Sequence, residues 1–291
     1  MASLREIRRK IKSVKSTEQI TRAMKMVAAA RMRRAQSSIL SARPFARGME
    51  DLAWTLSGGE DRALLRSHPF FRKPASGAPL LILVTADKGL CGSFNSNLFK
   101  AALEWLRRRP GKARVAVAGK KGRDFLHRLR GQDVEVTAEL AGIFPKVHFS
   151  HAEILGDSVI ADFEAGRASE VSVLYNEFKS VAQQKLSLKT LLPILPGPDF
   201  AGNASSEREF EPGRERLLDA LLRRFVKAEI YRVLLESQAA ELAARMNAMD
   251  AAAKNASELK ADLNLDLNRQ RQALITKEIA ELVGGAEALA S

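Results

Sequence analysis

Residues 214–283 read RERLLDALLRRFVKAEIYRVLLESQAAELAARMNAMDAAAKNASELKADLNLDLNRQRQALITKEIAELV. This stretch contains neither Gly nor Pro, and apolar residues recur in it at heptad positions: the a series is unbroken from Leu221 to Leu263, and the d series from Phe225 to Leu274 fails only at Arg232 and Lys260. The a series is Leu221, Ala228, Leu235, Leu242, Met249, Ala256 and Leu263, and the d series is Phe225, Ala239, Met246, Ala253, Leu267 and Leu274. A helix of this length would span roughly 105 Å, which is too long for a compact domain to bury. A 3.5-residue repeat sustained over this length predicts a coiled coil with a second long helix.

The N-terminal part of the chain supplies the partner helix. Residues 2–43 contain neither Gly nor Pro, and we expect their helix to end at Arg43-Pro44. Their apolar stripe has the same period, with a polar interruption at Glu18 and Thr21, and consists of Leu4, Ile7, Ile11, Val14, Ala28, Met32, Ala35 and Ile39. Because this helix is the shorter one, part of the C-terminal helix should have no partner within the chain. The alternative is a pair of ordinary amphipathic helices in a bundle.

The net charge of +13 is concentrated near the N-terminus. The first 50 residues carry 13 Lys or Arg and 3 Glu, whereas residues 214–291 carry 12 basic and 12 acidic side chains. The N-terminal helix therefore predicts an acidic partner, which could be nucleic acid, anionic lipid or an acidic protein surface. A face that is merely solvated is the remaining alternative. A transit peptide would also be basic, but the heptad phase argues against one.

Apolar runs and cysteine usage narrow the class of protein. The longest clean apolar run, Leu80–Val84, is far shorter than the roughly 20 residues that a membrane span needs. Cys91 is the only cysteine, so an internal disulfide and a Cys-rich metal site are excluded, and a reducing compartment is the default.

The middle of the chain, residues 78–195, changes to short apolar runs and predicts a small α/β domain. Strands are expected at 80–84, 113–118, 171–178 and 184–191, and helices at 97–109, 123–130 and 151–164. Alternating strands and helices indicate a largely parallel sheet. Residues 44–77 and 196–213, which are rich in Gly, Pro and Ser, are the expected connections. The predicted organisation is an N-terminal coiled-coil helix at 1–55, the α/β domain at 78–195, a connection at 196–213 and a C-terminal coiled-coil helix at 214–291.

Residues 85–97 follow the first strand, where an α/β enzyme would place its site. Gly89 and Gly92 lack the spacing of a dinucleotide fingerprint, and no Gly-Lys-Ser/Thr is present to hold a triphosphate. Cys91 would need a nearby base to act as a nucleophile, and the four histidines, His68, His127, His148 and His151, show no triad order. We therefore expect a tight turn in which Asp87 caps or pins the backbone and Cys91 is a small buried residue. No catalytic, cofactor-binding or metal-ligating residue is predicted.

Three segments carry a family resemblance. They are RRKIKSVKSTEQITRAMKMVAA at residues 8–29, DKGLCG at 87–92, and ARMNAMDAA at 244–252, which is followed by ITKE at 275–278 and GGA at 284–286. Together they resemble the γ subunit of F-type ATP synthases, and the similarity covers essentially the whole chain in order. Any one segment is a weak signal. All three, on two long helices that flank an α/β domain, form a specific one.

The resemblance implies an α/β fold with a long antiparallel coiled coil, in which the N- and C-terminal helices form a shaft and the central domain is Rossmann-like. It implies a non-catalytic central-stalk rotor subunit without cofactors, whose shaft stands inside a hexamer of α and β subunits. The rotor would couple ion-driven rotation of a c-ring to conformational changes in the catalytic β subunits for ATP synthesis or hydrolysis. The α/β domain would lie over the c-ring beside the ε subunit. The expected location is peripheral, at the cytoplasmic face of a bacterial inner membrane.

The resemblance also implies partner contacts for particular residues. Arg271, Gln272, Thr276 and Glu278 would touch a catch loop of a β subunit, with Met24 beside the same region. Arg31, Arg33 and Arg34 would lie near acidic loops of β. Glu209, Phe210 and Glu211 would form the foot that meets the c-ring and ε, although Phe210 stands where the family often carries Tyr. With one cysteine, the chain lacks the two-cysteine redox insertion of plant-type γ subunits.

Two other classes of protein remain as alternatives. A basic coiled-coil nucleic-acid-binding protein would explain the N-terminal charge, but only 6% of the residues are aromatic and could stack on bases. A nucleotide-dependent α/β enzyme would explain the central domain, but no catalytic constellation is visible in the sequence.

Overall fold

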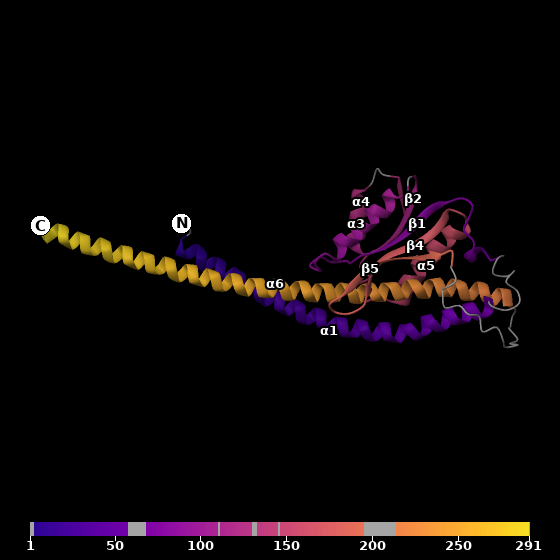
Figure 1. Cartoon of the computed structure of the whole chain (residues 1–291), viewed down its shortest axis with the longest axis horizontal. Helices are drawn as coiled ribbons and strands as arrows, with labels where there is room; N and C mark the ends of the chain where they lie inside the picture. Colours follow the sequence, from indigo (N-terminus) through magenta and orange to yellow (C-terminus); the bar gives the residue numbers. More distant parts are fainter. Residues whose placement is uncertain are drawn as a thin grey trace. The chain divides into compact units, whose positions relative to one another are not determined.

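The computed structural model describes residues 3–57, 68–109, 111–129, 133–144, 146–194 and 214–290. Two helices, α1 (Leu4–Ser57) and α6 (Arg214–Ala290), enclose all the other elements in the sequence (Figure 1). The chain divides into two compact units. Unit 1 consists of Met1–Ala28 and Met246–Ser291, and unit 2 is Ala29–Arg245, so that α1 and α6 each contribute to both. Among the described helices, none combines the length and apolar composition needed to cross a membrane.

Unit 1 is a pair of antiparallel helices. A capping box begins α1, because the Glu6 amide donates to the Ser3 hydroxyl and the Ser3 amide donates to the Glu6 carboxylate. Glu18 pairs with Lys260 and Lys25 pairs with Asp250, so residue numbers rise along one helix as they fall along the other. This confirms the predicted antiparallel coiled coil. From residue 271 to residue 285 every side chain of α6 is exposed, as expected for a helix that extends beyond its partner.

The prediction that the first helix ends at Arg43-Pro44 is wrong. Helix α1 continues through Pro44 to Ser57 and so includes part of the segment expected to be a connection. Proline fixes φ near −65°, a helical value, so a helix can pass through it, at the cost of one backbone hydrogen bond and of a clash between its ring and the carbonyl of residue i−4. Proline is therefore a weaker stop signal within a long helix than we assumed.

Unit 2 contains the α/β domain. Its sheet has the strand order β3-β2-β1-β4-β5, parallel except for β5, which pairs antiparallel with β4. The strands are β1 (Ala78–Val84), β2 (Ala113–Ala118), β3 (Val134–Leu140), β4 (Ala168–Phe178) and β5 (Gln184–Leu192). The short helix η1 (Pro69–Phe71) precedes β1, and the helices between the strands are α3 (Phe94–Arg107), α4 (Lys120–Arg128) and α5 (Phe149–Glu164). The central strand β1 is buried from Leu80 to Val84, which matches its continuous apolar run.

Within the α/β domain the expected strands and helices are present, and their ends differ from the predicted ends by up to three residues. Strand β3 was missed. Its sequence, VEVTAEL, alternates apolar and polar residues, and its side chains are half-buried or exposed because it lies at an edge of the sheet. The alternation was a readable signal of an edge strand.

Helices cover both faces of the sheet. Helices α3 and α4 lie together on one face, where Phe99 stacks on Phe125 with ring centroids 4.4 Å apart. Strands β1 to β3 are added toward one edge of the sheet, whereas β4 is added on the other side of β1. A right-handed crossover from β3 to β4 therefore places α5 on the opposite face of the sheet. Helix α6 packs beside α5, as the ring contact of Phe149 with Tyr231 shows. This packing buries every residue of α6 from Val233 to Ala243.

Candidate functional site

The turn after β1 is tied down by the carboxylate of Asp87. Its Oδ1 accepts from the amides of Lys120 and Gly142, and its Oδ2 accepts from the amide of Phe144, each at 2.8 Å. One side chain thus joins the chain segments that follow β1, β2 and β3. The prediction that Asp87 pins this turn is confirmed.

The neighbouring Thr85 closes the same region. Its hydroxyl donates to the Ala118 carbonyl and accepts from the Gly122 amide. A Cβ at Gly119, where φ is +101°, would lie 2.2 Å from the Thr85 carbonyl oxygen, so only glycine fits there. The backbone is packed too closely at this point to leave a phosphate-binding loop.

Cys91 has the character of a core residue. Only 2% of its surface is exposed, and burial raises the pKa of its thiol to about 11. The group is therefore protonated at neutral pH and is a poor nucleophile. This confirms the expectation that Cys91 is a small buried residue.

The turn after β1 lies against residues of both long helices, and we call this contact region the seat. Arg245 of α6 donates to the Gly89 carbonyl at 3.2 Å and forms an ion pair with Glu241. Arg245 and Glu241, together with Arg31 of α1 and Asp87, line a space of about 20 Å³, room for no more than a water molecule. Doubly wound folds commonly bind ligands here, where the strand order reverses. In unit 2 that position is filled by helix side chains.

Glu241 is the unusual titratable group of this seat. Burial raises the pKa of its carboxyl to about 7, and the negative charge of Asp87 adds to the effect, whereas Arg245 and Arg31 oppose it. Glu241 therefore exists in both protonation states near neutral pH.

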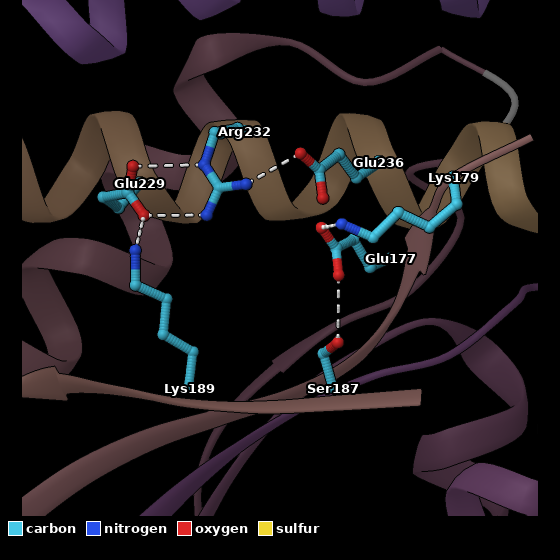
Figure 2. A network of polar contacts seen from close by, with 7 residues as sticks. All are labelled: Glu177, Lys179, Ser187, Lys189, Glu229, Arg232 and Glu236. Atoms are coloured by element: carbon cyan, nitrogen blue, oxygen red, sulfur yellow. Dashed lines mark hydrogen bonds and ion pairs between the residues drawn. The ribbon is translucent and has the colours of Figure 1, made fainter. Parts of the chain in front are cut away.

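A second polar cluster fixes α6 on the sheet (Figure 2). Arg232 makes two bonds to Glu229, of 2.9 and 3.1 Å, and one of 2.7 Å to Glu236. Lys189 of β5 reaches Glu229 at 2.5 Å. Burial alone would lower the pKa of Arg232, but the two carboxylates raise it above its usual range. One of the two failures in the d series is thus the centre of a buried ion network.

The other failure in the d series, Lys260, lies in the seam of unit 1. Its ammonium contacts Glu18 at 2.6 Å, and Glu18 also pairs with Arg22. Glu18 and Thr21 are buried at the positions where the stripe of α1 is interrupted. The polar breaks of the two helices therefore meet, and the seam is continuous.

Comparisons with known proteins agree with this architecture. A family model described as ATP synthase matches residues 3–289. The chain is 45% identical to the ATP synthase gamma chain of Elusimicrobium minutum and 43% identical to that of Chlorobium phaeobacteroides, in each case over 99% of both chains. This chain belongs to the ATP synthase γ-chain family.

Solved structures of this family share the fold. A chain from the central stalk and c-ring of the Tetrahymena thermophila mitochondrial ATP synthase is 25% identical, with a TM-score of 0.58 over 80% of this chain and 99% of that one. A chain from the Euglena gracilis mitochondrial ATP synthase is 20% identical, with a TM-score of 0.70 over 98% and 94%. The γ-chain family is a non-catalytic part of a membrane-associated complex. These comparisons give the nucleic-acid-binding alternative no support.

The structure separates two groups of residues that the γ-chain resemblance placed together. Lys25, the neighbour of Met24, pairs with Asp250, and 21 residues of α6, roughly 32 Å, separate Asp250 from Arg271. Met24 and the Arg271 group are therefore distinct places along unit 1. The group itself is exposed on one helix and consists of Arg271, Gln272, Thr276 and Glu278.

The remaining predicted contact residues divide into two sets. Arg31, Arg33 and Arg34 are all exposed on α1, in unit 2. Glu209, Phe210, Glu211 and the rest of the 196–213 connection lie outside the described residues.

Sequence reasoning missed the partners of Arg232 and Lys260, although it found the heptad failures that mark them. In the part of the chain that the structure describes, no group of three His, Cys, Asp or Glu side chains is placed to hold a metal.

Proposed function

We propose that this chain is the central-stalk rotor of an ATP synthase, which transmits rotation between a membrane c-ring and the catalytic β subunits. The observation that carries this proposal is the end of α6, where a helix without a partner in unit 1 exposes large apolar side chains. These side chains are Leu274, Ile275, Ile279, Leu282 and Val283, each between 44% and 74% exposed. Such a surface is normally covered by another molecule.

A sleeve of α and β subunits is the cover that the family assignment supports. Apolar contacts are non-directional, so the apolar side chains at this helix end can turn within a sleeve without breaking specific bonds. The antiparallel coiled coil of unit 1 is asymmetric, so its surface differs from one side of its long axis to another. When it turns, it would push on three β subunits in sequence and set their nucleotide affinities out of phase.

The exposed basic side chains of α1 are the second proposed contact. Arg33 and Arg34 have no described role inside the fold, and they would approach acidic loops of β. Arg31 shares this exposure but also lines the seat beside Glu241. Its substitution would therefore combine two effects.

We assign the α/β domain and the connection that includes Glu209, Phe210 and Glu211 to the foot of the rotor. There it would meet the c-ring and ε at the cytoplasmic face of a bacterial membrane. The mitochondrial chain of Tetrahymena thermophila comes from a structure of a central stalk with its c-ring, which supports this placement.

Co-purification tests the proposal as a whole. A tagged copy of the chain, expressed in its source cells and isolated in mild detergent, should recover α, β, ε and c subunits. Isolation of the chain without α and β would contradict the rotor assignment.

Charge reversal tests the basic contact. The double variant Arg33→Glu and Arg34→Glu should lower ATP synthesis in membranes without altering the folding of the chain, because exposed charges contribute little to stability. The matched control is Lys100→Glu with Lys121→Glu, two exposed positions in the α/β domain with the same charge change. Equal synthesis rates in the two double variants would remove this contact from the proposal.

Truncation tests the Arg271 group. Arg271→Ala with Gln272→Ala should impair assembly or turnover, whereas deletion of Ala286–Ser291 should be tolerated because it only shortens the apolar end. A larger loss from the deletion than from the double substitution would place the contact nearer the end of the chain.

A further inference from the structure

Helix α5 begins at a pair of histidines. His148 is its N-cap, and the His148 backbone amide donates to Nδ1 of His151 at 3.1 Å. Glu or Gln usually accepts this bond at the third helical position of a capping box. A carboxylate or a carboxamide can accept over a wide range of pH, whereas an imidazole can accept at Nδ1 only while this nitrogen carries no proton.

Protonation of His151 would reverse the role of Nδ1. An imidazolium carries N–H groups at both ring nitrogens, so two donors, Nδ1 and the His148 amide, would face each other. The N-terminus of a helix has a partial positive charge, which also disfavours a cation there. The ring centroids of His148 and His151 lie 5.7 Å apart, so a second proton on this pair adds repulsion between like charges. All these effects oppose the closed first turn in acid.

The pKa of His151 agrees with this geometry. Burial lowers the pKa below its ordinary value of 6.5, and the charge of His148 lowers it further. The closed turn therefore binds a proton more weakly than an open turn does. The stabilisation that the cap provides is complete above pH 6.5 and is lost as the pH falls through the lowered pKa.

Charged groups around the cap do not offset this effect. Lys146 precedes the cap and is itself basic. Glu153 follows His151 by two residues, a spacing at which helical side chains do not face each other. Asp157 pairs with Lys227 of α6 at 2.6 Å. Among the described residues, no carboxylate therefore stabilises an imidazolium at His151.

The first turn of α5 carries one side of a contact with α6. Phe149, the first residue of α5, packs edge-on against Tyr231 of α6, with ring centroids 5.5 Å apart and an interplanar angle of 76°. At the other end of α5, Glu164 accepts two bonds from Arg223 of α6, and these bonds do not involve the cap. Release of the first turn would loosen one end of the α5–α6 contact and leave the other end in place.

We propose that His148 and His151 form an acid-sensitive cap, which holds Phe149 against Tyr231 at neutral pH and releases it in mild acid. The α/β domain then holds α6 less tightly when the surrounding solution is acidic. His151 acts on this contact through the backbone of the first turn, so it is a positioning residue. The inference goes beyond the proposed rotor function and does not depend on it.

The chain has two tyrosines, which make the contact measurable. A chain labelled with ¹³C in its tyrosine rings gives NMR signals for Tyr231 and for Tyr175 of β4, which serves as the internal control. Between about pH 5 and pH 8 the Tyr231 signals should titrate, with a midpoint below 6.5, because the Phe149 ring moves away. The Tyr175 phenol should stay protonated throughout, since burial raises its pKa to about 12. Phe149→Leu should remove most of the Tyr231 titration, because the ring that shifts the signals is gone.

His151→Gln is the decisive variant, because a carboxamide oxygen accepts the His148 amide at every pH in this range. Its Tyr231 signals should lose at least about four-fifths of the wild-type titration. The matched control is His127→Gln, which removes the histidine that pairs with Glu139 outside α5 and should leave the Tyr231 titration unchanged. His148→Gln should raise the midpoint, because the charge of His148 no longer lowers the pKa of His151.

A Tyr231 titration that persists in His151→Gln would overturn the proposal and would point to Glu241 of α6, whose pKa is about 7. Tyr231 signals that do not change with pH in the wild type would overturn it as well. If His151→Gln does not fold, the imidazole signals of the wild-type chain labelled with ¹³C-histidine decide the matter. A His151 pKa at or above 6.5 would then show that the closed turn does not favour the neutral imidazole. Assembly with α and β subunits tests the rotor assignment separately.

Discussion

Single side chains hold several backbone segments together in this chain, and Asp87 is the clearest example. Its carboxylate receives three backbone amides at one end of the sheet, and the turn that it stabilises supports Arg245 of α6. A residue that could have served an enzyme active site instead supports the shaft.

We predict that Asp87→Ala destabilises the chain by about 3 kcal/mol, because hydrogen bonds to a charged group contribute more than neutral ones and three amides lose their acceptor. Asp87→Asn should fall between the variant and the wild type, since an amide offers one acceptor oxygen. Urea denaturation of the isolated chain measures both. A loss below about 1 kcal/mol in Asp87→Ala would show that water replaces the carboxylate at little cost.

Glu241 makes the stability of the chain depend on pH. Burial raises its pKa from 4.5 to about 7, so the folded state holds this proton more tightly than the unfolded state does. The stabilisation is complete below about pH 4.5 and is lost as the pH rises through 7. We predict that Glu241→Gln becomes more stable relative to the wild type between pH 4.5 and 8, by up to about 3 kcal/mol. Denaturation curves at several pH values check this, and a difference that is constant with pH would contradict it.

At the scale of elements, α6 passes through three environments. From Val233 to Ala243 it is buried all round in unit 2, in unit 1 it buries one stripe against α1, and from residue 271 to residue 285 it is exposed. The a series of the heptad ends at Leu263 and the d series ends at Leu274, so the pattern fades where α6 becomes exposed.

The seam of unit 1 gives a prediction about paired charges. Glu18→Leu or Lys260→Leu alone should lower the thermal midpoint, because each leaves one charged partner against apolar side chains in the seam. The double variant should recover the wild-type midpoint or exceed it, because two leucines continue the heptad. Thermal scans of the four proteins measure this coupling. Additive losses in the double variant would show that the pair does not interact.

The end of α6 should be the first part of the isolated chain to be cut by trypsin. Arg269, Arg271 and Lys277 lie where α6 gains no tertiary packing, so the helix frays there. Arg224 is also exposed on α6 but belongs to its packed segment, and it serves as the internal control. In the assembled complex the cuts at the end should be suppressed. Equal cutting at Arg224 and Arg271 in the isolated chain would contradict this account.

At the scale of the whole molecule, the chain combines two long helices with an α/β domain whose ligand position is occupied. The usual ligand position of its sheet is filled by Arg245 and Glu241, and its only thiol is buried and protonated. These features agree with the non-catalytic part that the γ-chain family plays in its complex.

We predict that the purified chain does not hydrolyse ATP in the presence of Mg²⁺. Addition of α and β subunits should restore turnover, and the increase should depend on this chain. Phosphate release assays measure both. Turnover by the chain alone that persists after removal of contaminating ATPases would overturn its non-catalytic role.

The hydrophobic periodicity of the sequence and the order of its motifs determined the secondary structure and the family. The heptads of residues 214–283 and the stripe from Leu4 to Ile39 predicted two long paired helices, because a 3.5-residue repeat can be satisfied only by another helix. Short apolar runs predicted the buried strands, and the turn residues predicted that Asp87 holds the backbone. These features depend on local spacing, which is fully present in the sequence.

Tertiary structure decided which distant polar groups meet. The sequence shows Arg232 and Lys260 as breaks in a heptad, but only folding brings Lys189 to the Glu229 carboxylate beside the first and Glu18 against the second. Folding also carried α1 through Pro44 and placed α6 at the reversal point of the sheet. The energy of a charged group depends on its neighbours and on its distance from water, and neither quantity can be read from spacing along the chain.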